Sequence, residues 1–198
     1  MKVAGYQRKE GAGVVFLDRD GVINEDSPNY IRSVQAFRFI PGSAEAIGRL
    51  SLAGMDIMLV TNQSVIHRGL VTKEGLNLIF DHLRQGLVEF GGRVKAVFYC
   101  PHRPDENCSC RKPRPGLFFR AETEYGVDLA ASIMVGDSAK DMEAARAAGV
   151  GILILVRTGN GRRDLPILME RGLGPDYVAE NLAGAVDWIL KDGRLPSE

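Results

Sequence analysis

The chain has 198 residues, a hydrophobic fraction of 45%, a charged fraction of 25% and a formal net charge of zero at pH 7. This length and composition suit one globular domain, residues 1–198, and the zero charge argues against recruitment to nucleic acid or anionic membranes by an overall field. No run approaches the roughly 20 apolar residues of a membrane span, and residues 1–12 lack the apolar core of a signal peptide, so we expect a cytoplasmic protein.

Short apolar runs alternate with segments of helical periodicity along the chain. We expect buried parallel strands at 13–17, 55–60, 94–100, 132–137, 151–156 and 176–178. Helical spacing follows Ser43 and Thr72, which we expect as helix N-caps, and further helices are expected at 116–126, up to Ala148 and at 182–190. The alternation predicts an α/β protein: a doubly wound, Rossmann-like parallel sheet with helices on both faces and no large cap domain.

Four of the expected strands lead into residues that can carry chemistry: Asp18, Thr61, Cys100 and Asp137. In open parallel sheets, ligands bind at the carboxyl ends of the strands. We therefore expect these four positions to converge on one site.

Acidic residues follow two of these strands. Asp18 and Asp20, in LDRDG, are two residues apart and are expected to share a face, and Asp137 is expected to join them from another strand end. Carboxylates, waters and a substrate phosphate together suit Mg²⁺. Taken singly, each of these aspartates is better explained as a turn or helix-cap residue, but three acids at strand ends of one sheet favour a metal site.

All three cysteines lie in the stretch CPHRPDENCSCRK, residues 100–112, which also holds a histidine. Three sulfurs and one nitrogen suit tetrahedral Zn²⁺, and four protein ligands leave no open position for catalysis. The expected ligands are Cys100, His102, Cys108 and Cys110. The alternative, three core cysteines and a surface histidine, fits poorly because the residues between them are too polar for a core. We expect a structural zinc that orders the loop and directs Arg111 and Lys112 to the site.

The segments FLDRDGVIN, LVTNQS, CRKP and MVGDSAKD, in this order, resemble the four motifs of haloacid dehalogenase (HAD)-type phosphatases. More narrowly, DRDGVIN, TNQS, the cysteine-rich loop and VRTG resemble the heptose bisphosphate phosphatases of that superfamily. The resemblance implies a Mg²⁺-dependent phosphatase that acts on the 7-phosphate of D-glycero-D-manno-heptose 1,7-bisphosphate, in the pathway to activated heptose for cell-surface polysaccharide.

A histidinol-phosphate phosphatase is the alternative. A zinc-ordered nucleic-acid-binding module is a third reading, against which the zero net charge weighs. The expected partner is therefore a small sugar bisphosphate, with neither nucleic acid nor membrane, and a monomer is expected.

The resemblance also implies residue roles. Asp18 is the expected nucleophile, which forms an aspartyl-phosphate, and Asp20 the expected general acid and base. The implied Mg²⁺ ligands are Asp18, the backbone carbonyl of Asp20, and Asp137, with Asp141 as a support or helix cap. Thr61 and Lys112 complete the implied phosphate clamp. The implied substrate-binding residues are Asp26, Tyr30, Thr61, Asn62, Gln63, Ser64, Arg111 and Lys112.

Two residues depart from the family pattern near the expected phosphate loop. Val65 and His67 stand where a glycine and a small residue are expected, and we expect His67 to be a surface or hydrogen-bonded histidine. Arg68 and Arg114 are expected to be solvated surface charges.

Overall fold

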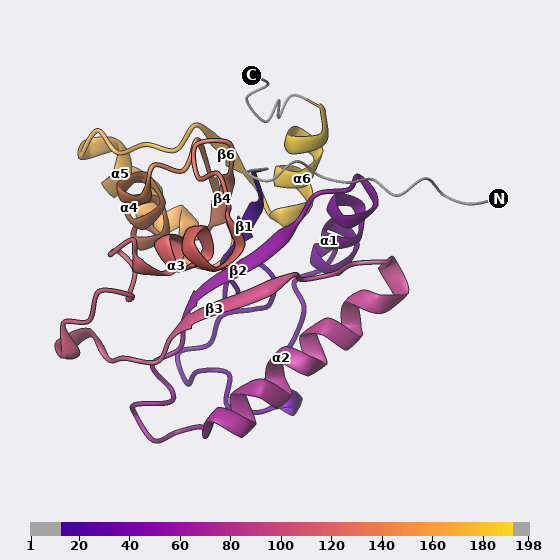
Figure 1. Ribbon diagram of the computed structural model, residues 1–198, viewed down its shortest axis with the longest axis vertical. Helices are drawn as coiled ribbons and strands as arrows, with labels where there is room; N and C mark the ends of the chain where they lie inside the picture. The colour runs from indigo at the N-terminus through magenta and orange to yellow at the C-terminus, as the bar shows by residue number, and fades with distance from the viewer. Residues whose placement is uncertain (1–12, 192–198) are drawn as a thin grey trace.

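Six parallel strands form one sheet in the computed structural model, which describes residues 13–191 (Figure 1). The strand order is β3-β2-β1-β4-β5-β6. The strands are β1 (Val15–Leu17), β2 (Ile57–Asn62), β3 (Ala96–Cys100), β4 (Ile133–Gly136), β5 (Ile152–Val156) and β6 (Tyr177–Ala179). The order reverses between β1 and β4, which is the point where a doubly wound sheet opens a crevice for ligands. The expected α/β sheet is confirmed.

Helices cover both faces of the sheet. They are α1 (Ser43–Leu52), α2 (Lys73–Leu87), α3 (Gly116–Tyr125), α4 (Ala139–Ala148), α5 (Gly161–Glu170) and α6 (Leu182–Lys191). Short 3₁₀ turns occupy Val34–Ala36, Val88–Phe90 and Pro104–Glu106. Figure 1 shows α1, α2 and α6 on one side of the sheet and α3, α4 and α5 on the other. None of the helices within residues 13–191 has the length and apolar character needed to cross a bilayer.

The central strand illustrates why the core has two halves. Val15 and Leu17 pack into the cluster beneath α1, α2 and α6, whereas Phe16 packs into the cluster beneath α3, α4 and α5. Successive strand residues point to opposite faces, so a strand that is covered on both sides is apolar throughout. Fully burying each such side chain contributes about 1.5–3 kcal/mol, which fixes β1 and the residues that follow it.

The helix starts confirm one expected cap and correct another. Thr72 caps α2 as expected, because its Oγ1 accepts a hydrogen bond of 3.1 Å from the backbone N–H of Gly75. The prediction that Ser43 caps α1 is wrong: Gly42 is the N-cap, with φ of 81°. The hydroxyl of Ser43 instead donates to the carbonyl oxygen of Ile23, at 2.6 Å. It therefore ties α1 to the segment that follows β1.

Candidate active site

Two aspartates and a lysine meet where β1 and β4 end side by side. Asp18 follows β1 and Asp137 follows β4, and Lys112 enters from the loop after β3. The ammonium of Lys112 donates to the carbonyl oxygen of Val60 in β2, at 2.7 Å. It also lies 3.1 Å from Asp18 Oδ1 and 2.5 Å from Asp141 Oδ1. A buried lysine thus joins three elements at the carboxyl edge of the sheet.

The carboxylates at this edge form a possible metal site. Oxygens of Asp18, Asp137 and Asp141 all lie within 4.8 Å of one another. Burial raises the pKa of Asp18 to about 7 although the Lys112 ammonium opposes the rise. Burial raises the pKa of Asp137 to about 8, and repulsion from Asp141 and Asp18 adds to it. Three ionised carboxylates and one ammonium leave two negative charges, so one divalent cation balances the cluster. An all-oxygen donor set fits Mg²⁺.

The third carboxylate of this cluster is that of Asp141, whereas the ligand expected from Asp20 is its backbone carbonyl. Asp141 also caps α4 as expected: its Oδ2 accepts from the backbone N–H of Ser138 at 3.0 Å and from the Ser138 hydroxyl at 2.8 Å. Burial lowers the pKa of the Lys112 ammonium, but the charges of Asp141 and Asp18 outweigh burial and raise this pKa above its usual value. The cluster therefore holds a permanently charged lysine.

The carboxylate of Asp20 lies in a separate network of donors. Arg19 Nη2 donates to both of its oxygens at 2.7 Å, and Arg19 Nε donates to Oδ1 at 3.0 Å. Asn24 Nδ2 donates to Oδ1 at 2.9 Å, and Gln63 Nε2 donates to Oδ2 at 2.9 Å. With its carboxylate held in this way, Asp20 could reach a metal at the cluster only through its backbone carbonyl.

The TNQS segment lies at the end of β2, and its side chains largely hold the site together. Gln63 Nε2 donates to Thr61 Oγ1 at 3.0 Å, besides its bond to Asp20. Asn62 and Lys112 form a reciprocal pair: Asn62 Nδ2 donates to the Lys112 carbonyl and Lys112 N donates to Asn62 Oδ1, both at 3.1 Å. Ser64 Oγ accepts from Arg68 Nε at 3.4 Å. The Asn62 amide is thus committed to placing Lys112.

The two remaining expected sugar contacts lie on the loop after β1. Asp26 Oδ1 accepts from the backbone N–H of Ser27 at 2.7 Å. Tyr30 is partly exposed and has φ of 61°, and the centre of its ring lies 5.7 Å from the Arg68 guanidinium carbon. A tyrosine in the left-handed region is strained. Arg68 is an exposed charge, as expected, and it also contacts Tyr30 and Ser64.

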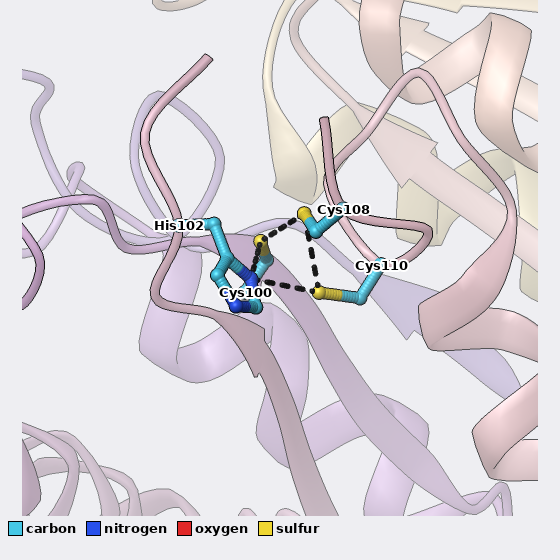
Figure 2. Close-up of side chains that lie close together, drawn as sticks. All are labelled: Cys100, His102, Cys108 and Cys110. Atoms are coloured by element: carbon cyan, nitrogen blue, oxygen red, sulfur yellow. Dashed lines mark hydrogen bonds between the residues drawn. The ribbon is translucent and has the colours of Figure 1, made fainter. Parts of the chain in front are cut away.

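The four expected zinc ligands point toward one another at the end of β3 (Figure 2). The Sγ atom of Cys108 lies 3.6 Å from those of Cys100 and Cys110, and His102 Nδ1 lies 3.4 Å from Cys100 Sγ and 3.3 Å from Cys110 Sγ. Bonds of about 2.3 Å to sulfur and 2.0–2.1 Å to nitrogen imply tetrahedral ligand separations of roughly 3.5–3.8 Å. The group is thus compatible with zinc, and the sulfurs are too far apart for disulfides.

Cationic residues surround a pocket of about 280 Å³ beside this cluster. The pocket is lined by Arg103, Pro104, Asn107, Cys108, Arg111, Lys112, Pro113, Arg114 and Lys140. Arg111 donates to the carbonyl oxygen of His102 at 3.0 Å, and Arg114 donates to that of Cys108 at 2.6 Å. Arg114 is exposed, as expected, and its guanidinium is also hydrogen-bonded to the loop backbone. The zinc loop presents its positive charges to an open pocket.

His67 connects two loops at the rim of the site, as a hydrogen-bonded histidine. Its Nδ1 lies 2.8 Å from Glu106 Oε1, and its ring packs edge-on against His102, with centroids 4.8 Å apart. The bond to His67 lowers the pKa of Glu106.

Sequence reasoning missed two residues that contact the expected catalytic and metal-binding aspartates. Arg19 is only 1% exposed, and its guanidinium carbon lies 5.8 Å from the centre of the Phe80 ring. Asn160 donates two hydrogen bonds to Asp137. The only available signals were the arginine between two acids in DRDG and the asparagine after VRTG. Neither pattern indicates where the side chain points.

Comparison with known proteins gives one consistent result. The HAD-hydrolase-like family model matches residues 109–185. Proteins named D-glycero-β-D-manno-heptose-1,7-bisphosphate 7-phosphatase are 43% identical over 180 residues in Bordetella bronchiseptica and 47% identical over 178 residues in Pseudomonas aeruginosa. Each alignment covers 90% of this chain and 98% of the relative. A crystal structure of D,D-heptose 1,7-bisphosphate phosphatase from B. bronchiseptica, complexed with magnesium and phosphate, matches with a TM-score of 0.84 and 42% identity, over 91% of this chain and 99% of that chain.

Proposed function

Because the chain belongs to the HAD-like family of D-glycero-β-D-manno-heptose 1,7-bisphosphate 7-phosphatases, we propose that it removes the 7-phosphate of this sugar bisphosphate by Mg²⁺-dependent hydrolysis. It is a phosphoric monoester hydrolase. The observation that carries the proposal is the buried cluster of Asp18, Asp137 and Asp141 around the Lys112 ammonium, at the switch point of the sheet. Histidinol phosphate is the disfavoured alternative, because the relatives from B. bronchiseptica and P. aeruginosa are named as heptose bisphosphate phosphatases.

Asp18 is the proposed nucleophile. Its Oδ1 already accepts from the backbone N–H of Arg19 at 2.7 Å and lies against Lys112. Oδ2 is therefore the oxygen left to attack phosphorus. The P–O bond to the sugar breaks as the Asp18–phosphate bond forms, and water later releases inorganic phosphate and restores the carboxylate. A Mg²⁺ ion held by Asp18, the Asp20 backbone carbonyl and Asp137 supplies charge neutralisation for an anionic nucleophile and an anionic phosphate.

Asp20 is the proposed general acid and base. A sugar alkoxide is a poor leaving group, so its oxygen needs a proton as the P–O bond breaks. The protonated Asp20 carboxyl gives that proton, and the resulting carboxylate then takes one from the attacking water. The donors on Asn24 and Gln63 keep this side chain beside the end of β1.

Lys112 and Thr61 are the proposed clamp on the transferring phosphoryl group. The Lys112 charge is fixed by its two carboxylate partners and lies beside the proposed nucleophile. The proposed substrate contacts are the backbone of the TNQS segment, Arg111, and the side chains of Asp26 and Tyr30. The cationic pocket beside the zinc loop suits the phosphate that is not removed, since guanidinium groups bind phosphate oxygens in pairs.

Zinc is the proposed structural ion of the cysteine loop. Four protein ligands close its shell, so its contribution is to shape the loop that presents Arg111 and Lys112.

Phosphate release from the β-anomer of heptose 1,7-bisphosphate, with Mg²⁺ or with a chelator, tests the proposal. We expect Mg²⁺-dependent turnover to the heptose 1-phosphate, identified by ³¹P NMR, and weaker turnover of histidinol phosphate at equal concentration. Asp18→Asn should abolish turnover and the acid-stable phosphoenzyme label. Preference for histidinol phosphate contradicts the substrate assignment, and turnover by Asp18→Asn contradicts the nucleophile.

A further inference from the structure

The turn between β5 and α5 contacts the acidic centre although no expected catalytic residue lies in it. Asn160 donates to Asp137 Oδ2 twice, from its backbone N–H at 2.8 Å and from Nδ2 at 3.0 Å. Both bonds end on the same oxygen. Within residues 13–191 no hydrogen bond reaches Asp137 Oδ1, which leaves that oxygen for a further ligand.

The position of Asn160 in the chain makes this orientation informative. Asn160 is the N-cap residue of α5, a place where an asparagine side chain usually accepts a bond from the first turn of the helix. The Asn160 side chain makes no such bond. Its amide is turned toward Asp137 instead, so stabilising α5 does not explain it.

The backbone around Asn160 is held against the turn that follows Asp18, the proposed nucleophile. Thr158 Oγ1 donates to the carbonyl oxygen of Gly21 at 2.6 Å. Gly21 and Gly159 both have positive φ, and a Cβ at either position would overlap Asp137 Oδ2. The two glycine turns therefore lie next to each other against Asp137 Oδ2, the same oxygen that accepts both hydrogen bonds from Asn160.

We propose that Asn160 is a positioning residue that fixes the Asp137 carboxylate so that its free oxygen faces the divalent cation. The inference rests on the proposed function only in taking Asp137 as a cation ligand. Groups that hydrogen-bond to a metal ligand set its orientation, and removing one typically weakens metal binding about 10–100-fold. The backbone N–H of Asn160 is retained in the alanine, serine and glutamine variants, so we expect a loss near the lower limit of that range.

Direct Mn²⁺ binding to the zinc-loaded protein, followed by electron paramagnetic resonance and competed with Mg²⁺, tests the inference without any turnover. Asn160→Ala should bind Mn²⁺ about 10-fold more weakly than the unchanged protein. Asn160→Gln, which keeps an amide donor, should recover part of the loss. Asn181→Ala is the matched control, because its side chain caps the remote helix α6 by accepting from the Gly184 N–H at 3.0 Å. It should leave Mn²⁺ affinity unchanged.

Zinc content and the thermal midpoint establish that each variant is folded, and Asn160→Ser carries the comparison if Asn160→Ala is insoluble. Equal Mn²⁺ affinity in Asn160→Ala, or in Asn160→Ser where that variant replaces it, and in the unchanged protein would overturn the positioning role. Failure of the unchanged protein itself to bind Mn²⁺ that Mg²⁺ displaces would instead overturn the metal site of the proposed function, and the two results are therefore distinguishable.

Discussion

Replacing Lys112 by methionine separates its structural contribution from its chemical one. The Lys112 side chain is 2% exposed, and its ammonium contacts Asp18, Asp141 and the Val60 carbonyl. Breaking a buried ion pair by removing one partner costs about 3–5 kcal/mol, because the other charge stays buried. Since about 1 kcal/mol shifts the midpoint of a domain of this size by about 2–4 °C, the Mg²⁺-free variant should melt roughly 10 °C lower at pH 8.

The same substitution should cost less at pH 5. The folded-state pKa values of Asp18 and Asp137 are raised, so both carboxyls are largely protonated there and the lysine has less charge to balance. Thermal unfolding by circular dichroism, with chelator and at both pH values, measures this. Lys95→Met is the matched control: its ion pair with Asp56, at 2.8 Å, is on the surface, where such pairs contribute about 0–1 kcal/mol. If Lys112→Met and Lys95→Met have the same thermal midpoint at pH 8, the reasoning about the buried cluster fails.

Three further outcomes follow from the site. Asp20→Asn should slow kcat/KM for the sugar phosphate far more than for an aryl phosphate, whose leaving group needs no proton; equal losses would contradict a general acid. Removing zinc with a chelator should lower both the thermal midpoint and kcat while Asp18 remains able to be phosphorylated, measured by acid-stable labelling; full activity in zinc-free protein would contradict the structural role. Mg²⁺ should raise the thermal midpoint more at pH 8 than at pH 5. The raised pKa values mean that the folded, metal-free protein holds protons which the unfolded chain releases near pH 4, so its stability falls as the pH rises from about 4 to 8. The cation binds the ionised form, and a pH-independent Mg²⁺ effect would contradict this linkage.

Features that depend on local pattern could be predicted from the sequence. The buried strands were visible as apolar runs, and the Thr72 cap followed from residue type. Helix α5 was missed because Pro166 and the arginines at its start obscure its periodicity. Ser43 has the residue type of a cap, but the Ile23 carbonyl takes its hydroxyl.

The details of the site depended on directions that spacing does not encode. Asp18 and Asp137 were expected to meet because adjacent strand ends meet, and they do. The carboxylate of Asp20 turns to Arg19, whereas that of Asp141 joins the cluster. Predicting this would have required knowing which hydrogen-bond donors surround each carboxylate. Asn160 was invisible because its contact joins the turn after β5 to the turn after β4, and only the sheet order brings those turns together.

The negative charge left over in the carboxylate cluster imposes an order of arrival on the two ligands. Without a cation, a phosphate dianion that approaches Asp18 meets a like-charged surface with a single ammonium to attract it. A bound divalent cation balances that excess charge and removes the repulsion. The protein should therefore capture metal first and sugar second, so that free Mg²⁺ governs how tightly the substrate is held as well as how fast it reacts.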